Sequence, residues 1–197
     1  VYPFFDAVAL MPPGIDFTTS IMPYYLVAPE YNPYKVPVWV EPYIDATGKG
    51  YIISISCPVY AEGHFEAAAG SDIAVLPISQ DYLGPSDEAL FIVTCDHLLV
   101  ASNQACTDLL GLEALGEYHY LEPVEEDVYA SSRFRLQDHA SPFIRQLARR
   151  LDGKADFTLD INGRLIRFRQ FPIPEVGWTL VLAEHIPATQ TQAVSGN

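Results

Sequence analysis

The stretch WVEPYIDATGKGYIISISCPVY, residues 39–60, decides the fold of the first half of this 197-residue chain. Residues 36–45, which overlap the start of this stretch, alternate between apolar and polar side chains, and this alternation predicts a half-buried strand. The glycines of ATGKG predict a turn, because glycine adopts positive φ angles without steric cost. The β-branched run at 51–60 predicts a second strand. A third strand is predicted at 65–78 after AEGH, so the three should form an antiparallel meander.

A second β-rich unit is predicted to follow the polar, turn-rich segment 79–88, which marks a boundary. Its predicted elements are a hairpin at 89–102 turning at Asp96-His97, a short helix from Thr107 or Asp108, a helix at 141–153 capped by Ser141, a hairpin about Asn162-Gly163 and a strand at 176–186. Short strands are also predicted at 3–10 and 22–27. Long βαβ alternation is missing, so the sequence favours α+β architecture with antiparallel sheets over a parallel doubly wound fold.

The charge of the chain is distributed unevenly, which argues against nucleic acid as a partner. The formal net charge is −14, and residues 1–132 carry two lysines against 19 acids, or 2 − 19 = −17. Residues 133–197 carry 9 basic residues against 6 acids, or +3. An acidic surface repels the phosphate backbone. The late arginines are interpreted as a solvated helix face and one strand face.

Cysteine and histidine usage gives no sign of a metal site or a catalytic centre. Cys57, Cys95 and Cys106 form no CxxC pair, so either Cys95 and Cys106 form one bridge or all three are small buried side chains. The five histidines are scattered without ligand spacing, and no hydrolase, P-loop or dinucleotide motif occurs. We therefore expect no catalytic residue, no metal and no cofactor.

Several motifs together resemble the double Cache (dCache) extracellular sensor domains of bacterial transmembrane receptors. They are PYYLVAPEYNP, WVEPYID, ISISCPVY followed by GSDIAV, and the late GRLIRFRQFPIPEVGWTLVLAEHIP. The resemblance implies α+β architecture with two tandem PAS-like (Cache) modules, each an antiparallel sheet with flanking helices. Residues 1–80 would be the membrane-distal module, missing the family's long N-terminal helix. Residues 81–187 would be the membrane-proximal module, and 188–197 a tail toward a transmembrane helix.

The resemblance also implies a ligand pocket in the distal module. The family's pocket positions fall on Tyr24, Tyr25, Tyr43, Asp45 and Asp72. The arginine that holds a ligand carboxylate in amino-acid-binding members is replaced by Met22, which disfavours α-amino acids and favours an amine or a neutral polar metabolite. Lys35 is the nearby residue that could supply the missing positive charge.

Strand alternation brings three further residues to the predicted pocket. Trp39 should share a face with Tyr43 and Asp45, apart from a kink at Pro42, and Ser54 and Ser56 should face them from the next strand. Other roles stay open: a core anchor for Trp39, a turn cap for Asp45 and an internal partner for Asp72. The proximal module offers no matching aspartate.

The resulting hypothesis is a periplasmic or extracellular ligand-sensing domain of an inner-membrane receptor. Its expected partner is a small molecule, the full-length protein is expected to be membrane-anchored, and a homodimer is one expected assembly. A histidine kinase is the first expected output, with a chemoreceptor or a diguanylate cyclase as alternatives. A ligand-free structural or partner-binding ectodomain is the competing class, followed by a secreted hydrolase using Asp45 and Asp72.

Overall fold

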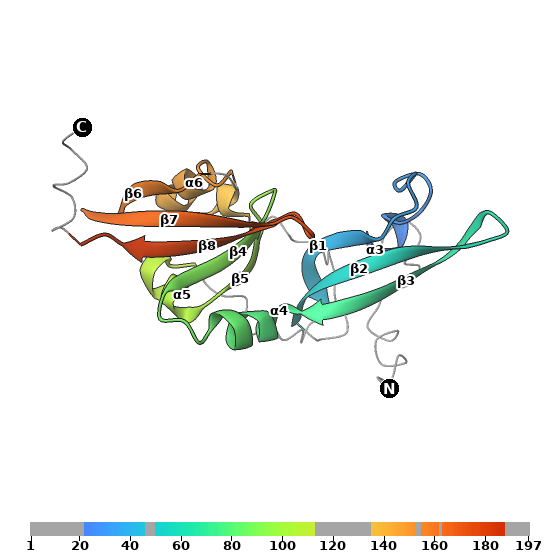
Figure 1. Cartoon of the computed structure of the whole chain (residues 1–197), viewed down its shortest axis with the longest axis horizontal. Coiled ribbons are helices and arrows are strands. Elements are labelled where there is room, and N and C mark those ends of the chain that lie inside the picture. The colour runs from blue at the N-terminus through green and yellow to red at the C-terminus, as the bar shows by residue number, and fades with distance from the viewer. Residues whose placement is uncertain (1–21, 46–49, 113–134, 153–154, 162, 188–197) are drawn as a thin grey trace. The chain divides into compact units, whose positions relative to one another are not determined.

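The chain contains two compact units, each built around one antiparallel sheet (Figure 1). This computed structural model describes residues 22–45, 50–112, 135–152, 155–161 and 163–187. The units meet in the sequence between Val75 and Leu76, a few residues before the expected boundary. The α+β prediction with two antiparallel sheets is confirmed. The strand expected at 3–10, the turn at 46–49, most of 116–137 and the tail after 187 lie outside the described residues.

The first unit contains the predicted three-stranded meander. Its strands are β1 (Val38–Asp45), β2 (Gly50–Ala61) and β3 (His64–Ala74), in the order β1-β2-β3. The turn between β2 and β3 is formed by Glu62 and Gly63, which both have positive φ, at 51° and 86°. Two consecutive residues with positive φ match the right-handed twist of a hairpin, so this turn fixes the register of the long β2–β3 pair.

A β-bulge interrupts β1 at Glu41 and Pro42. Val40 pairs with Ser54, whereas Tyr43 pairs with Ile52, so β1 contains one residue more than β2 over this interval. Proline has no N–H to donate to a ladder, and bulges are where sheets tolerate it. The bulge changes which face of the sheet the later residues of β1 occupy.

Two segments flanking this sheet differ from the prediction. Residues 22–27, expected as a strand, begin with the short helix α3 (Met22–Tyr25), whose Pro23 carbonyl accepts a hydrogen bond from the Ser56 hydroxyl. The third strand ends at Ala74 rather than at residue 78. It is followed by α4 (Val75–Pro77) and the π-helix η1 (Ile78–Leu83), so part of the expected boundary segment is helical.

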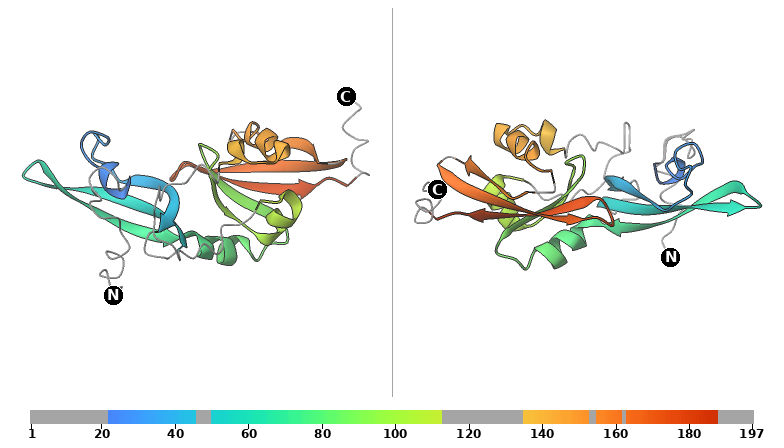
Figure 2. Two further views of the ribbon diagram at one scale, coloured as in Figure 1. Left: turned by 180° about the vertical axis from the view of Figure 1, so that it is seen from behind. Right: turned by 45° about the horizontal axis from the view of Figure 1, so that its top comes forward.

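The second unit is a five-stranded sheet in which the first strand lies beside the last. The strands are β4 (Ala89–Thr94), β5 (Leu99–Ser102), β6 (Phe157–Ile161), β7 (Arg164–Ile173) and β8 (Trp178–His185), in the order β5-β4-β8-β7-β6. Both predicted hairpins and the closing strand are confirmed. Figure 2 shows β7 and β8 side by side along this sheet from two directions.

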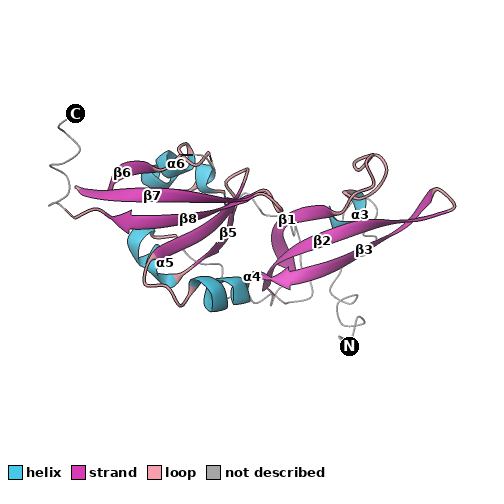
Figure 3. Cartoon of the chain, in the orientation of Figure 1, coloured by secondary structure: helices cyan, strands magenta, loops and turns pink. Residues whose placement is uncertain are grey.

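Helices on one face of this sheet enclose its hydrophobic core. They are α5 (Gln104–Leu110), the 3₁₀ turn η3 (Leu136–Asp138) and α6 (Pro142–Ala148), coloured as helices in Figure 3. Ile144 and Leu147 of α6 are fully buried against strand residues such as Phe91 and Phe168. Phe168 stacks on Phe157 with ring centroids 5.2 Å apart. The apolar stripe predicted for this helix therefore forms the core of the unit.

The start of α5 and the end of α6 differ from the sequence prediction. Helix α5 begins at Gln104, because the side chain of Asn103 caps it by accepting from the Cys106 N–H at 3.0 Å. The same amide binds the carbonyls that lead into β4, donating to Leu83, Ser86 and Glu88 at 3.1, 3.2 and 2.8 Å. Helix α6 ends at Ala148, and Ser141 precedes it without a side-chain capping bond.

Candidate functional site

A chain of hydrogen bonds links three of the predicted site residues across the first sheet. The hydroxyls of Tyr43 and Ser54 lie 2.8 Å apart, and Ser54 donates to Asp72 Oδ1 at 2.6 Å. Ser54 pairs with Asp72 in the ladder, and Tyr43 pairs with Ile52 two positions away on the same face of β2. Ser54 is buried at 1% exposure, whereas Asp72 is exposed. A buried hydroxyl thus orients a carboxylate that faces solvent.

Small residues around this chain allow the backbone of β3 to lie close to β2. Gly70 pairs with Ser56, and a Cβ added at Gly70 would stand 2.9 Å from the Ile55 carbonyl oxygen. Real Cβ atoms essentially never approach a backbone oxygen so closely. Ser56 itself is buried and its hydroxyl holds α3 through the Pro23 carbonyl. The face that carries Asp72 is therefore also the face on which α3 lies.

The predicted common face for Trp39 and Tyr43 is wrong. Trp39 pairs with Ile55, so it lies on the opposite face of the sheet from Ser54 and Asp72. The cause is the bulge at Glu41 and Pro42, which adds one residue between Trp39 and Tyr43 and reverses the alternation. Asp45 ends β1 opposite Gly50, but its side chain lies outside the described part of the structure.

The paired tyrosines of α3 line an aromatic hollow of about 860 Å³, and the described part of its wall does not include Asp72. The rings of Tyr24 and Phe65 have centroids 5.6 Å apart, and those of Tyr25 and Tyr31 are 5.5 Å apart. The described wall of the hollow is formed by Tyr24, Tyr25, Ala28, Pro29, Glu30, Tyr31 and Phe65. Of the residues predicted for the pocket, the described wall of this hollow contains Tyr24 and Tyr25.

Lys35 contacts this aromatic group rather than the polar chain. Its ammonium lies 4.3 Å from the centroid of the Tyr60 ring, and Tyr60 packs edge-on against Phe65 at 5.8 Å. Tyr60 is six residues from Ser54 along β2, or roughly 20 Å at the usual strand rise of about 3.3 Å per residue. In this structure Lys35 therefore supplies no charge at Asp72.

The second unit has smaller hollows with a different lining. One of about 500 Å³ lies between α5 and the end of β8, and its described walls carry Asp87, Glu88, Arg167, Glu184 and His185 beside alanines and Leu109. Another of about 530 Å³ includes Phe143 of α6. The described walls of these two hollows lack the several aromatic rings that line the hollow in the first unit.

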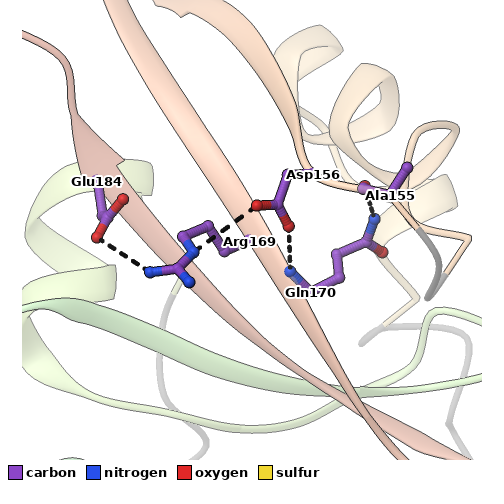
Figure 4. A network of polar contacts seen from close by, with 5 residues as sticks. All are labelled: Ala155, Asp156, Arg169, Gln170 and Glu184. Atoms are coloured by element: carbon purple, nitrogen blue, oxygen red, sulfur yellow. Dashed lines mark hydrogen bonds and ion pairs between the residues drawn. The ribbon is translucent and has the colours of Figure 1, made fainter.

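Arg169, one of the late arginines, takes part in a network of structural contacts in the second unit. Figure 4 shows Arg169 of β7 between Asp156 and Glu184, at 3.7 and 4.0 Å. Asp156 also accepts from the Gln170 N–H, and the Gln170 side chain donates to the Ala155 carbonyl at 2.5 Å. The network ties the segment before β6 to β7, as expected for charges along a strand face.

The cysteine predictions need correction. All three cysteines are free, so the bridge between Cys95 and Cys106 is not formed. Cys95 is exposed, which also contradicts three buried side chains, and Cys57 is half-buried. Burial raises the pKa of the Cys106 thiol to about 12 from an ordinary 9.0. Among the described residues, no group of three or more His, Cys, Asp or Glu side chains is arranged to hold a metal ion.

Sequence reasoning missed the residues that complete the aromatic hollow. Tyr31 and Glu30 lie in a proline-containing segment expected only as a loop, and Phe65 was assigned only to a strand. The spacing of Tyr60 and Phe65 about the AEGH turn was the available signal, because residues flanking a hairpin turn face each other.

Solved structures with a similar fold are ligand-binding or extracellular domains. The ligand-binding domain of Mlp24 with asparagine has a TM-score of 0.56 at 18% identity, covering 88% of this chain and 59% of that one. The extracellular domain of the histidine kinase mmHK1S-Z2 scores 0.53 at 15% identity, with coverage of 87% and 57%. The ligand-binding domain of the Pseudomonas fluorescens chemoreceptor CtaA with L-serine scores 0.56 at 19% identity, with coverage of 89% and 64%.

The chain has the fold of Cache-type sensor domains. It spans about three fifths of the length of these structures. Searches with protein-family models and among curated proteins give no match. None of the helices in the described residues has the length and apolar character needed to cross a membrane.

Proposed function

We propose that this chain is the extracellular or periplasmic sensing region of a membrane-anchored receptor, and that its first unit binds a small amine or neutral polar metabolite at Asp72. The observation that carries the proposal is the hydrogen-bonded chain from Tyr43 through Ser54 to Asp72. One oxygen of the Asp72 carboxylate accepts from Ser54, and a carboxylate has further lone pairs for a ligand. Because Ser54 fixes the carboxylate, a donor group can bind it at little entropic cost.

The charge of the first unit supports a cationic or donor-rich ligand. Residues 22–75 contain Lys35 and Lys49 against six acids, or 2 − 6 = −4. The resemblance to Cache domains assigns Met22 to the position of the carboxylate-binding arginine, and Lys35 is engaged with Tyr60. A ligand whose main charge is a carboxylate would therefore meet Asp72 without a nearby described cation, whereas an ammonium group would find a charge-assisted acceptor.

A histidine kinase remains our first candidate for the signalling output, supported by the fold shared with the mmHK1S-Z2 extracellular domain. A chemoreceptor is the second candidate, because the Mlp24 and CtaA domains match at least as well. Their ligands include asparagine and L-serine, which both carry an amino group. In this proposal the first unit is membrane-distal and the second is membrane-proximal.

Thermal-shift screening followed by calorimetry on the purified chain tests the ligand class. The panel comprises primary amines, amino acids and small carboxylic acids. We expect stabilisation by an amine or a neutral donor-rich compound. Asp72→Asn should weaken its binding by about 10–100-fold, because hydrogen bonds to charged groups contribute about 1.5–3 kcal/mol. Glu66→Gln is the matched control, since Glu66 is an exposed acid on the same strand.

Two outcomes would contradict the proposal. The first is binding of simple carboxylic acids alone, retained in Asp72→Asn, which would show that the site prefers the opposite charge. The second is a ligand whose affinity responds only to substitutions in the second unit. Equal weakening by Glu66→Gln would show that the total charge of the unit, rather than Asp72, determines affinity.

A further inference from the structure

Near the turn that joins them, β7 and β8 carry apolar side chains on both faces of the second sheet. On the inner face, Phe168 belongs to the hydrophobic core beneath the helices. On the outer face, Phe171 pairs with Leu180 and Ile173 pairs with Trp178, and we call these four residues the outer quartet. An antiparallel sheet with one face in water usually alternates apolar and polar residues, so these strands are typical of a sheet that is covered on both faces.

The outer quartet is accessible to solvent in this structure. Phe171 is 41% exposed, and the other three side chains are half-buried. Among the described residues, the hydrophobic core of the unit takes its strand side chains from the inner face and includes no member of the quartet. Contiguous exposed apolar patches with a polar rim are typical of surfaces that bind another protein.

Charges of both signs form the rim of the outer quartet. The Arg169 guanidinium lies 5.3 Å from the centroid of the Phe171 ring. The same side chain reaches Asp156 at 3.7 Å and Glu184 at 4.0 Å (Figure 4). The side chains of Arg169 and Glu184 are 44% and 32% exposed, so both can also contact a second molecule. Aromatic residues and arginine are enriched in protein interfaces, which the composition of this patch matches.

We propose that a second copy of this chain packs on the outer quartet and forms a two-fold symmetric dimer. A two-fold axis parallel to the strands and midway between β7 and β8 places β7 of one copy over β8 of the other. Ladder partners lie at the same height along their strands, so Phe171 lies over the partner's Leu180 and Ile173 over the partner's Trp178. The apolar part of the patch is therefore complementary to itself.

The same axis also matches the charges of the rim. Arg169 pairs with Leu182, which is two residues from Glu184 on β8. The axis therefore brings Arg169 of one copy within side-chain reach of the partner's Glu184, and the reverse contact forms by symmetry. Opposite charges across an interface favour this arrangement over others. The dimer does not depend on the ligand proposed for Asp72.

The size of the face sets the expected affinity. Leu90 and Ile92 of β4 extend it, because they pair with the outer residues Leu182 and Leu180 of β8. With strands about 4.8 Å apart and about 3.3 Å per residue, β4, β8 and β7 together present roughly 14 Å by 26 Å, or about 400 Å² of sheet plane. This is below the roughly 800 Å² per partner of a standard interface, so we expect a weak dimer with a dissociation constant of about 10–100 µM.

Sedimentation equilibrium of the purified chain from about 5 to 500 µM tests the proposal. The wild-type chain should change from monomer to dimer within this range. Phe171→Lys should weaken dimerisation at least about tenfold, because it buries a charge beside Arg169. Because Phe171 is exposed, this variant should keep the fold, as circular dichroism can verify. Tyr82→Lys is the matched control, since Tyr82 is a 79% exposed aromatic residue of η1 outside the quartet, and it should leave dimerisation unchanged.

An exchange of charges distinguishes contacts between copies from contacts within one copy. Arg169→Glu and Glu184→Arg should each weaken self-association, because like charges then meet across the two-fold axis. An equimolar mixture of the two variants should restore dimers, because each copy supplies the sign that the other lacks. A role of Arg169 and Glu184 within one chain predicts no such rescue.

A chain that stays monomeric up to about 500 µM would overturn the proposal, as would dimers that Phe171→Lys leaves unchanged. Failure of the mixture to restore dimers would refute the two-fold arrangement. If the monomer instead binds an amphipathic helical peptide of leucine and lysine, and Phe171→Lys abolishes that binding, the face belongs to a helix and the dimer is overturned.

Discussion

Replacing Ser54 with alanine should destabilise the first unit by about 1–2 kcal/mol. The Ser54 hydroxyl lies 2.8 Å from the Tyr43 hydroxyl and 2.6 Å from Asp72 Oδ1, and the side chain is buried. A neutral hydrogen bond contributes about 1 kcal/mol. The bond to Asp72 is charge-assisted but ends on an exposed carboxylate that water can solvate, so we assign it about 0.5–1 kcal/mol.

The two tryptophans allow each unit to be followed separately. Trp39 belongs to the first unit and Trp178 to the second, and the chain has two tryptophans in all. In a Trp178→Phe background, urea unfolding monitored by Trp39 fluorescence should show the midpoint lowered by about 0.5–2 M, at a slope of about 1–2 kcal/mol per M. In a Trp39→Phe background, the transition reported by Trp178 should not move.

A matched serine and a double-mutant cycle make the test specific. Ser71→Ala, at the exposed neighbour of Asp72, should change stability by less than about 0.5 kcal/mol. Asp72→Asn combined with Ser54→Ala should be less destabilising than the sum of both, because the two changes remove one shared bond. The reasoning would be refuted if the losses in the free energy of unfolding for Ser54→Ala and Asp72→Asn were strictly additive, or if Ser54→Ala lowered that free energy by less than about 0.5 kcal/mol.

Three further outcomes concern the second unit. Phe168→Ala should cost about 3–5 kcal/mol by urea unfolding, because the ring is fully buried against Phe157, whereas Phe168→Leu should cost less. Asn103→Ala should cost about 2–3 kcal/mol in the same assay, since the side chain satisfies several buried backbone groups. Thiol labelling of the native chain should modify Cys95 rapidly and Cys106 only after unfolding. Because burial raises the Cys106 pKa to about 12, the contribution of this thiol to the free energy of unfolding is complete below pH 9 and falls as the pH rises from 9 toward 12, by about 1.4 kcal/mol per pH unit. Cys106→Val should remove that decline.

Local sequence signals predicted the strands well, because strand formation here follows side-chain pattern and turn chemistry. The β-branched run of β2 and the turn glycine at 163 predict a strand and a hairpin that the structure contains. The helix boundaries were harder, since Asn103, Thr107 and Asp108 are all competent caps. Only the contact of the Asn103 amide with the segment before β4 distinguishes it, and that contact is tertiary.

Only part of the candidate site could be predicted, because the assignment of side chains to a face of the sheet depends on strand register. Alternation along single strands correctly placed Ser54 and Asp72 on a common face. Alternation failed for Trp39, because the bulge adds one residue to β1 and reverses the faces of the residues on either side of it. The position of α3 could not be predicted from periodicity, because a four-residue helix leaves no periodic signal and its place on the sheet depends on the Ser56 bond to Pro23.

The strand order of the second sheet has a consequence for biosynthesis. Ala89 of β4 pairs with Ala183 of β8, so these partners are 183 − 89 = 94 residues apart, whereas Ile52 and Ala74 in the first sheet are 22 apart. At about 5–20 residues per second, a ribosome needs roughly 5–20 s to make the chain between β4 and β8. During that interval the β2–β3 hairpin can already pair, while β4 has one edge without its partner. The nascent second unit therefore passes through an aggregation-prone stage that the first sheet avoids, and premature termination before residue 178 would prolong it.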